Sequence, residues 1–342
     1  MEFKETVKYL AALNGTSGDE GEVTKAIIGL LPKDADYRID PLGSLIVFKK
    51  GRNRPKSKLM LDAHTDEVGF IVTNINSDGT LSFDAVGGIL PYAVFGRQVK
   101  FKNGVCGAIA GVPLHLLEGE AKDAQPKLSE LCIDIGADSK EEAEKSLQPG
   151  DCAYFTGEQF DFGDGFMAGK ALDDRVGCAI MLELMKEELP YDCTFSFSVQ
   201  EEIGTRGAAA SAFSVNPDIA VVLETTTACD ISGVKGEKRV CELGKGPVVS
   251  YMDKGTVYDR RLYRLAFETA KEIGVQCQTK TAVAGGNNSG AIHKTAGGVR
   301  TTAVSLPCRY LHSPYCVIKE SDLYETVKLT KALIEKLGGL ES

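Results

Sequence analysis

Tryptophan is absent from this chain of 342 residues, and so are the short motifs of several enzyme classes. Without tryptophan the chain lacks the ring that best stacks on sugars, which disfavours a glycoside hydrolase even though paired carboxylates are present. The chain has no H-E-x-x-H, no G-x-S-x-G and no phosphate-binding glycine loop. None of the ten cysteines forms a C-x-x-C pair, and most lie in apolar runs, so we expect reduced, buried thiols.

Long hydrophobic runs and positive charge are also scarce. No apolar stretch approaches the roughly 20 residues of a membrane span, and the N-terminal sequence MEFKETVKYLAAL has no apolar core of a signal peptide. The net charge is -9, and no basic patch with interleaved aromatic residues occurs. We therefore expect a cytoplasmic protein that binds neither membranes nor nucleic acid.

Helices and strands alternate in the first and last parts of the chain, which predicts an α/β sheet with helices on both faces. Hydrophobic periodicity indicates helices at 2–13, 22–31, 174–187, 205–213, 258–273 and in the last 20 or so residues. Strand-like runs occur at 37–39, 44–48, 58–63, 193–199, 219–223, 276–283 and 299–306. The segment SGDE, residues 17–20, has the composition of a helix start.

The middle of the chain has a different pattern of apolar and turn-forming residues. Residues 66–164 contain many short runs of Val, Ile and Phe separated by Gly, Asn or Asp, with one short helix at 140–146. This pattern predicts a small β-rich barrel or sandwich. We therefore expect an α/β domain made of residues 1–65 and 165–342, interrupted by a β-rich domain at 66–164.

Histidine is rare, with four residues in the chain, and two of them follow predicted strands. His64 comes directly after the strand KLMLDA, within HTDEVGF. Ligands bind at the carboxyl ends of strands in α/β sheets, so His64 is placed to bind one. Asp66 could accept the second imidazole N–H, as the outer partner of a metal-bound histidine does. A surface histidine in a turn is the alternative for His64 taken alone.

Carboxylates occur at the ends of the neighbouring strands. Asp173 and Asp174 precede a predicted helix, where one Asp would suffice as a cap. Other acids and one more histidine follow apolar strands: Glu201, Glu202, Glu224 and His312. Two imidazoles and several carboxylates, without a cysteine, suit zinc, cobalt or manganese. Two ions fit this number of ligands better than one, because a single catalytic zinc needs three protein ligands.

The motifs HTDEVGFIV, KALDDRVG, SVQEEIGTRGA, LGKGP and RYLHSP resemble the TET or glutamyl-aminopeptidase family of dinuclear metallopeptidases. They occur in the family's order along nearly the whole chain. The resemblance implies a mixed-sheet, zinc-exopeptidase-like catalytic domain interrupted by a barrel-like dimerisation domain. It also implies hydrolysis of N-terminal residues from peptides, and a homo-oligomer that ranges from a dimer to a tetrahedral dodecamer.

The resemblance assigns roles to individual residues. His64 and Glu224 resemble the ligands of one ion, Glu202 and His312 those of the second, and Asp173 the carboxylate that bridges both. Zinc is the first choice of ion, with cobalt or manganese as alternatives.

Two further residues of this chain match catalytic positions in the family. Glu201 resembles the general base and Asp66 the partner that orients His64.

The chain departs from the family pattern at two places. Glu224 stands where the family usually has Asp, and related carboxypeptidases use Glu there, so a carboxypeptidase-like enzyme or a deacylase is the alternative activity. Asn287 and Asn288 replace a usual Thr-Asp pair. A scaffold with a vestigial site is disfavoured, because the base and every ligand position are filled. The sequence does not predict the preferred N-terminal residue.

Overall fold

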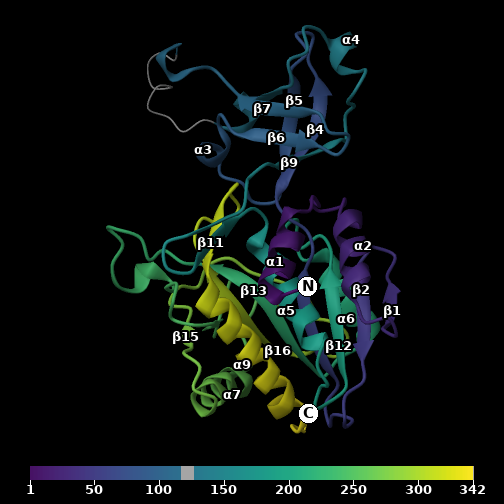
Figure 1. The fold of residues 1–342 in the computed structure, drawn as a ribbon, viewed down its shortest axis with the longest axis vertical. Coiled ribbons are helices and arrows are strands. Elements are labelled where there is room, and N and C mark those ends of the chain that lie inside the picture. The colour runs from purple at the N-terminus through teal and green to yellow at the C-terminus, as the bar shows by residue number, and fades with distance from the viewer. Residues whose placement is uncertain (117–126, 342) are drawn as a thin grey trace.

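The computed structural model describes residues 1–116 and 127–341, in which a six-stranded barrel lies above a larger α/β unit (Figure 1). The α/β unit contains an eight-stranded sheet, and both chain termini lie at this unit (Figure 1). In spatial order the strands are β1 (Asp36–Ile39), β2 (Leu45–Lys49), β12 (Cys193–Ser198), β3 (Leu59–His64), β13 (Ile219–Thr227), β16 (Arg300–Cys308), β14 (Val248–Val249) and β15 (Gln278–Thr279).

The four central strands, β12, β3, β13 and β16, run parallel to one another. β1, β2 and β14 pair antiparallel, so the sheet is mixed, as predicted. Every residue of β3 and β12 is buried, which explains their near-continuous apolar sequences. The parallel register sets Ser198 beside His64, so the last residues of these strands meet at one edge of the sheet.

Helices cover both faces of this sheet, which confirms the predicted fold class. Leu59 and Leu61 pack in the larger core with residues of α1, α5, α7 and α9, whereas Met60 packs on the other face with residues of α6 and α8. The helices are α1 (Phe3–Ala12), α2 (Gly21–Leu30), α5 (Leu172–Met185), α6 (Arg206–Val215), α7 (Arg260–Glu272), α8 (Ser289–Ile292) and α9 (Glu320–Gly338). No helix among the described residues is long and apolar enough to cross a membrane.

The predicted barrel is present. Its strands close in the order β4 (Gly69–Ile75), β5 (Leu81–Val86), β8 (Cys132–Asp134), β7 (Cys106–Ala110), β6 (Gln98–Phe101) and β9 (Cys152–Phe155). Phe70 anchors the interior by edge-to-face contacts with Phe83 and Phe155, each at 5.1 Å between ring centroids. Short helices α3 (Pro91–Val94) and α4 (Lys140–Ala143) and 3₁₀ turns at Leu114–Leu116 and Leu128–Glu130 complete it.

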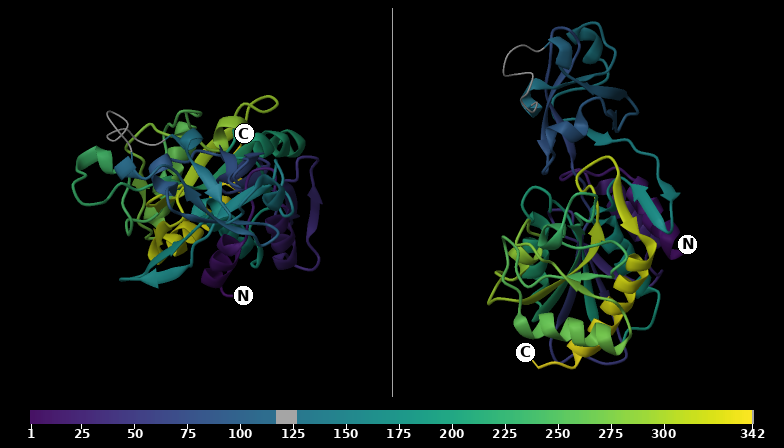
Figure 2. Two further views of the ribbon diagram at one scale, coloured as in Figure 1. Left: turned by 90° about the horizontal axis from the view of Figure 1, so that it is seen from above. Right: turned by 90° about the vertical axis from the view of Figure 1, so that its left-hand side faces the viewer.

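A small sheet joins the barrel to the α/β unit, and Figure 2 shows it below the barrel on the side of the N-terminal helices. It consists of β10 (Phe160–Phe162), β11 (Phe166–Gly169) and β17 (Cys316–Lys319). β11 leads the chain back to α5, and β17 follows the loop that carries His312. This sheet therefore places two site segments, distant in sequence, beside each other.

One predicted strand is wrong in length. The run 276–283 contributes only the two residues of β15, because its one neighbour among the described strands, β14, is itself two residues long. Beyond it, Lys280 Nζ donates to the carbonyl of Ala284 at 2.7 Å, within a loop. A 3₁₀ turn at Gly236–Arg239 lies in the other long loop of this side.

Candidate metal centre

All five side chains that the sequence assigns as ligands meet at the carboxyl edge of the sheet. His64 ends β3, and Glu224 lies on the neighbouring strand β13. Glu202 follows β12, and Asp173 is at the start of α5 with non-helical backbone angles. His312 lies in the loop between β16 and β17. The parallel strands bring these residues together as the sequence predicts.

Asp173 lies between the two histidines. Its Oδ1 is 3.4 Å from His64 Nε2, and its Oδ2 is 3.4 Å from His312 Nε2. Glu224 Oε1 lies 3.5 Å from His64 Nε2, and Glu202 Oε1 lies 3.3 Å from His312 Nε2. The cluster thus consists of two histidine–glutamate groups that share one aspartate.

The second nitrogen of each imidazole faces a backbone carbonyl. His64 Nδ1 is 3.0 Å from the carbonyl oxygen of Asp66, and His312 Nδ1 is 2.7 Å from that of Gly88. A carbonyl oxygen only accepts, so each Nδ1 donates, and a neutral ring leaves Nε2 free to bind a cation. Gly88 follows strand β5 of the barrel, so the barrel orients one of the two histidines.

Asp66 holds the backbone of the two glutamates as well as lying beside His64. Its Oδ1 accepts from Glu201 N at 3.0 Å, and its Oδ2 accepts from Glu202 N at 3.1 Å and from Ser17 Oγ at 2.6 Å. The distance from Asp66 Oδ1 to His64 Nδ1 is 3.4 Å, longer than that to the backbone carbonyl. The carboxylate therefore positions the glutamate turn, and its backbone oxygen is the closer partner of the histidine.

The cluster has more negative than positive charge. Burial raises the pKa of Glu201 to about 8, and burial also raises the pKa values of Glu202 and Glu224. Burial opposes protonation of His312, but Asp173 and Glu202 raise its pKa to about 12. These shifts favour the protonated form of the three glutamates. Burial also opposes ionisation of Asp173, but the two histidines lower its pKa well below the usual range. Divalent cations would compete with the protons on the glutamates.

Two oxygens of the cluster also need a partner. Asp173 Oδ1 and Glu202 Oε1 are buried and accept no hydrogen bond from the residues that the structure describes. Ligand atoms of His64, Asp173 and Glu202 all lie within 4.8 Å of one another. A buried unpartnered carboxylate oxygen is costly, and imidazole nitrogen with carboxylate oxygen is the donor set of zinc and similar ions. These residues fit divalent ions.

Asp174 lies beside the cluster but is held by backbone. Its atoms are also within 4.8 Å of ligand atoms of His64 and Glu224. However, Asp174 Oδ1 accepts from Gly177 N at 3.1 Å, and Oδ2 accepts from His64 N at 3.3 Å. The first contact is a helix cap, so the two adjacent acids have different partners.

Left-handed backbone occurs at several non-glycine residues around the cluster. Gln200, directly before the two glutamates, has φ 58°, and His312 itself also has φ 58°. Ala171, with φ 52°, precedes Asp173 by two positions. Such conformations are costly and concentrate where the surrounding structure fixes a functional side chain.

A family model described as M42 glutamyl aminopeptidase matches residues 43–329. The chain belongs to the M42 family of aminopeptidases. A putative aminopeptidase of Acetivibrio thermocellus is 39% identical, over 94% of this chain and 96% of its own length. This M42 protein is thus a hydrolase of peptide bonds, and membership of a metallopeptidase family means that it uses divalent metal.

Two further relatives support the assignment. The lysyl aminopeptidase of Pyrococcus furiosus is 33% identical to this M42 protein over 98% of both chains. The solved TET1 peptidase of Pyrococcus horikoshii, whose title says that it can assemble into a tetrahedron or a large octahedral shell, is 33% identical with a TM-score of 0.85. The match covers 97% of this chain and 99% of that one. The resemblance and the fold expected from the sequence are confirmed.

The sequence does not indicate that some residues of this M42 protein belong to the site. The carbonyl of Gly88 and the hydroxyl of Ser17 contact site residues that are far from them in the chain. Gly88 lies in a stretch that the sequence describes only as β-rich. Its role depends on the packing of the barrel against the α/β unit, which no local pattern encodes.

Proposed function

We propose that this enzyme is a dinuclear aminopeptidase that removes N-terminal residues from peptides. The observation that carries this proposal is the position of Asp173, whose two carboxylate oxygens face two different imidazoles at 3.4 Å. One ion would be held by His64 and Glu224 and the other by His312 and Glu202. Zinc is the first choice, and cobalt or manganese would suit the same donors.

The chemistry needs a base as well as ions. Two divalent ions, when bound, would polarise the scissile carbonyl and lower the pKa of the attacking water. Glu201 makes no ion pair with either histidine among the described residues, so it is free to accept a proton from the attacking water and to deliver it to the leaving amine. Asp66 holds the backbone of Glu201 in place. The free α-amino group of the substrate docks against the carboxylates, which explains exopeptidase action.

Metal dependence and substrate class can be tested together. We expect about two divalent ions per chain in the purified enzyme, complete loss of activity after dialysis against a chelator, and recovery with zinc, cobalt or manganese. A panel of aminoacyl, N-acyl, C-terminal peptide and glycosyl reporters is expected to show hydrolysis of the free-amine aminoacyl group. Full activity in excess chelator, or hydrolysis confined to acyl, C-terminal or glycosyl substrates, would contradict the proposal.

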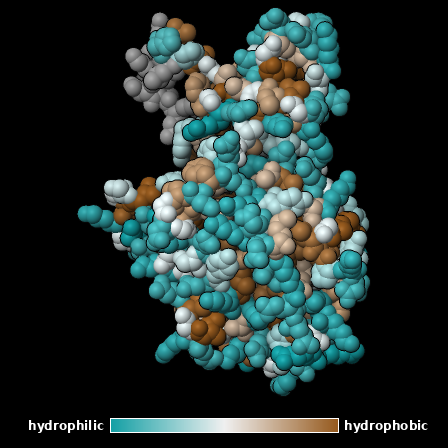
Figure 3. Space-filling view, in the orientation of Figure 1, coloured by the Kyte–Doolittle hydropathy of each residue, from teal (hydrophilic) through white to brown (hydrophobic). Residues whose placement is uncertain are grey.

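We also propose that residues 66–164 form the self-association domain, although residues 117–126 of this range lie outside the described residues. The support is a set of large apolar side chains that the barrel leaves exposed, and Figure 3 shows hydrophobic patches on the barrel. These residues are Leu90 (55% exposed), Tyr92 (61%), Phe95 (45%), Val112 (57%) and Leu116 (63%). A second copy of this chain would cover this surface in a dimer, and dimers could build the shell described for the TET1 peptidase.

Substitution tests this surface better than deletion, because deletion would remove Asp66 and Gly88 with it. Tyr92→Glu combined with Val112→Glu is expected to lower the mass measured by sedimentation velocity. Phe213→Glu is the control, because Phe213 is 71% exposed on α6 of the α/β unit. A wild-type chain that is monomeric at micromolar concentration would refute the proposal, as would a double variant that assembles like the wild type.

A further inference from the structure

Glu20 is the last residue of the SGDE segment and does not cap the helix that follows it with its side chain. It occupies the N-cap position of α2, but its side chain makes no capping hydrogen bond among the described residues. Instead, Glu20 Oε1 accepts from Gly18 N at 2.9 Å and from Gln200 N at 3.0 Å. The side chain is 5% exposed. A buried carboxylate thus accepts a hydrogen bond from a backbone amide on a distant part of the chain.

Gln200 begins the turn that carries Glu201 and Glu202. The three consecutive amides of this turn each donate to a carboxylate: Gln200 N to Glu20 at 3.0 Å, and the next two to Asp66 at 3.0 and 3.1 Å. Gln200 has left-handed backbone with φ 58°, a conformation that persists only where its surroundings fix it. Glu20 therefore fixes the strained end of the turn, and Asp66 fixes the end that carries the glutamates.

We propose that Glu20 is a positioning residue for catalysis, which sets the direction in which Glu201 and Glu202 leave strand β12. The inference rests on the proposed function, in which these glutamates are the base and a metal ligand. Among the described residues, the Glu20 side chain makes no hydrogen bond or ion pair with a candidate ligand side chain or with the side chain of the base, and it acts through the backbone of Gln200.

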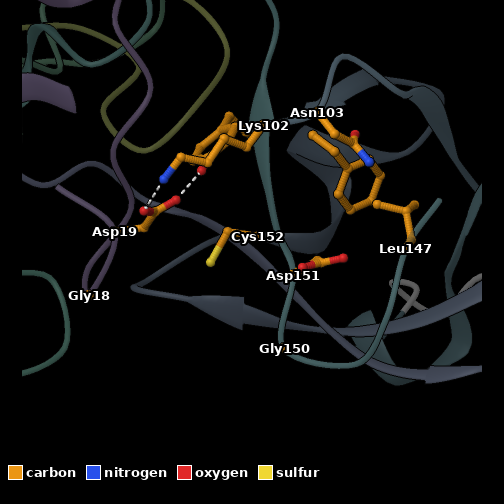
Figure 4. Close-up of a pocket in the computed structure, with 10 residues that line it drawn as sticks. Gly18, Asp19, Lys102, Asn103, Leu147, Gly150, Asp151 and Cys152 are labelled. Carbon is orange, nitrogen blue, oxygen red and sulfur yellow. Dashed lines mark hydrogen bonds and ion pairs between the residues drawn. The ribbon is translucent and has the colours of Figure 1, made fainter. Parts of the chain in front are cut away.

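The segment that carries Glu20 also contacts the barrel. Asp19 Oδ1 accepts from Lys102 Nζ at 2.6 Å, and Asp19 Oδ2 accepts from the hydroxyl of Tyr154. These contacts lie on one side of a cleft of about 560 Å³, in which Figure 4 shows Asp19 pointing towards Lys102, with Cys152 beside them. Ser17, three residues before Glu20, donates to Asp66. The segment thus connects the barrel to both carboxylates that hold the glutamate turn.

The chemistry of Glu20 predicts which substitutions preserve its role. Both amides donate to the same oxygen, Oε1, so one amide carbonyl can accept from both of them. Burial, together with the charge of Asp66, raises the pKa of Glu20, so a neutral side chain is tolerated at this position. Glu20→Gln should therefore keep the turn in place. Glu20→Ala removes the acceptor, and Glu20→Asp retracts it by one methylene.

The experiment compares kcat, KM, metal content and Tm of the metal-saturated variants with those of the wild type. Glu20→Ala and Glu20→Asp are expected to lower kcat by roughly 10–100-fold, the cost of a misplacement of about 1 Å, with KM within about 2-fold. Glu20→Gln is expected to keep kcat within about 3-fold, since its carbonyl oxygen replaces Oε1. Asp192→Ala is the matched control, because Asp192 accepts from Gly51 N at 2.8 Å at the opposite edge of the sheet.

Each outcome decides the inference. If Glu20→Ala lowers Tm no differently from Asp192→Ala and keeps wild-type kcat, Glu20 has a structural role alone and the inference is wrong. If Glu20→Ala does not fold, Glu20→Asp decides by the same criterion. Should the substrate panel reveal another hydrolase activity, the aminopeptidase proposal fails. The kcat of that other activity then still reports whether Glu20 positions the turn.

Discussion

Glu201→Gln is expected to keep both metal ions and peptide binding while kcat falls by about 10²–10⁴-fold, the usual cost of losing a general acid–base residue. Glutamine preserves the size and hydrogen bonding of the side chain but cannot accept the proton. In the protein without cations, burial raises the pKa of Glu201 to about 8. Bound cations favour the charged form and lower that pKa, which leaves the carboxylate ready to act as a base near neutral pH.

Glu202→Gln is the matched variant, one residue along the same turn. Glu202 Oε1 lies 3.3 Å from His312 Nε2, so this substitution is expected to weaken metal binding, and added metal should partly restore activity. Metal stoichiometry and kcat are measured for both variants side by side. If Glu201→Gln is depleted of metal and rescued by it, while Glu202→Gln keeps its ions and is inactive, the two roles are exchanged. Near-wild-type rates in both variants would show that neither glutamate takes part in catalysis.

The sheet and the ligand cluster could be predicted because they follow from local patterns. Leu59, Met60 and Leu61 are consecutive apolar residues, and in the structure they alternate between two buried faces. A strand buried on both faces belongs inside a sheet with helices on each side. The polar residue that ends such a strand, His64, must then lie at the sheet edge, so the sequence places it beside the ends of the neighbouring parallel strands.

The contacts that orient the cluster could not be predicted, because they join backbone groups far apart in sequence. The SGDE segment indicates only a helix start, and nothing in it predicts that Glu20 accepts a hydrogen bond from Gln200 N, 180 positions away. Asp66 was expected to orient His64 through its carboxylate, but the backbone carbonyl of Asp66 is closer. Gly88 contacts His312 through its backbone carbonyl, which every residue type has, so its residue type does not reveal the contact. These contacts depend on how the barrel and the loops pack.

The barrel therefore contacts the candidate site and also carries the surface proposed for assembly. It supplies the carbonyl of Gly88 to His312, and Lys102 and Tyr154 to Asp19. Assembly through its exposed apolar face would restrict the motion of the barrel relative to the α/β unit. In the proposed dimer, these contacts would link assembly to the positions of His312 and of the segment that carries Glu20.

Asp173→Asn is expected to have the largest effect on metal content, because Asp173 is the residue that both halves of the cluster share. Asparagine has nearly the same shape, but its amide nitrogen cannot bind a cation. Each carboxylate oxygen of Asp173 now lies 3.4 Å from an imidazole nitrogen, of His64 or of His312. In the variant a nitrogen would replace one of these oxygens, so one ion would lose a ligand. The variant should lose at least one ion per chain. Its affinity for metal should fall by more than the roughly 10–100-fold that is lost when a residue hydrogen-bonded to a metal ligand is removed.

Asp174→Asn is the control for this prediction, since Asp174 is buried next to Asp173 but accepts from Gly177 N and His64 N. It is expected to lower Tm while both ions remain bound. Metal content by mass spectrometry, isothermal titration with zinc and kcat are measured on both proteins. If Asp174→Asn loses its ions and Asp173→Asn retains two, then Asp174 is the shared ligand. If both variants keep two ions with wild-type affinity, no carboxylate at the start of α5 bridges the metals, and the assignment of Asp173 as the shared ligand is wrong.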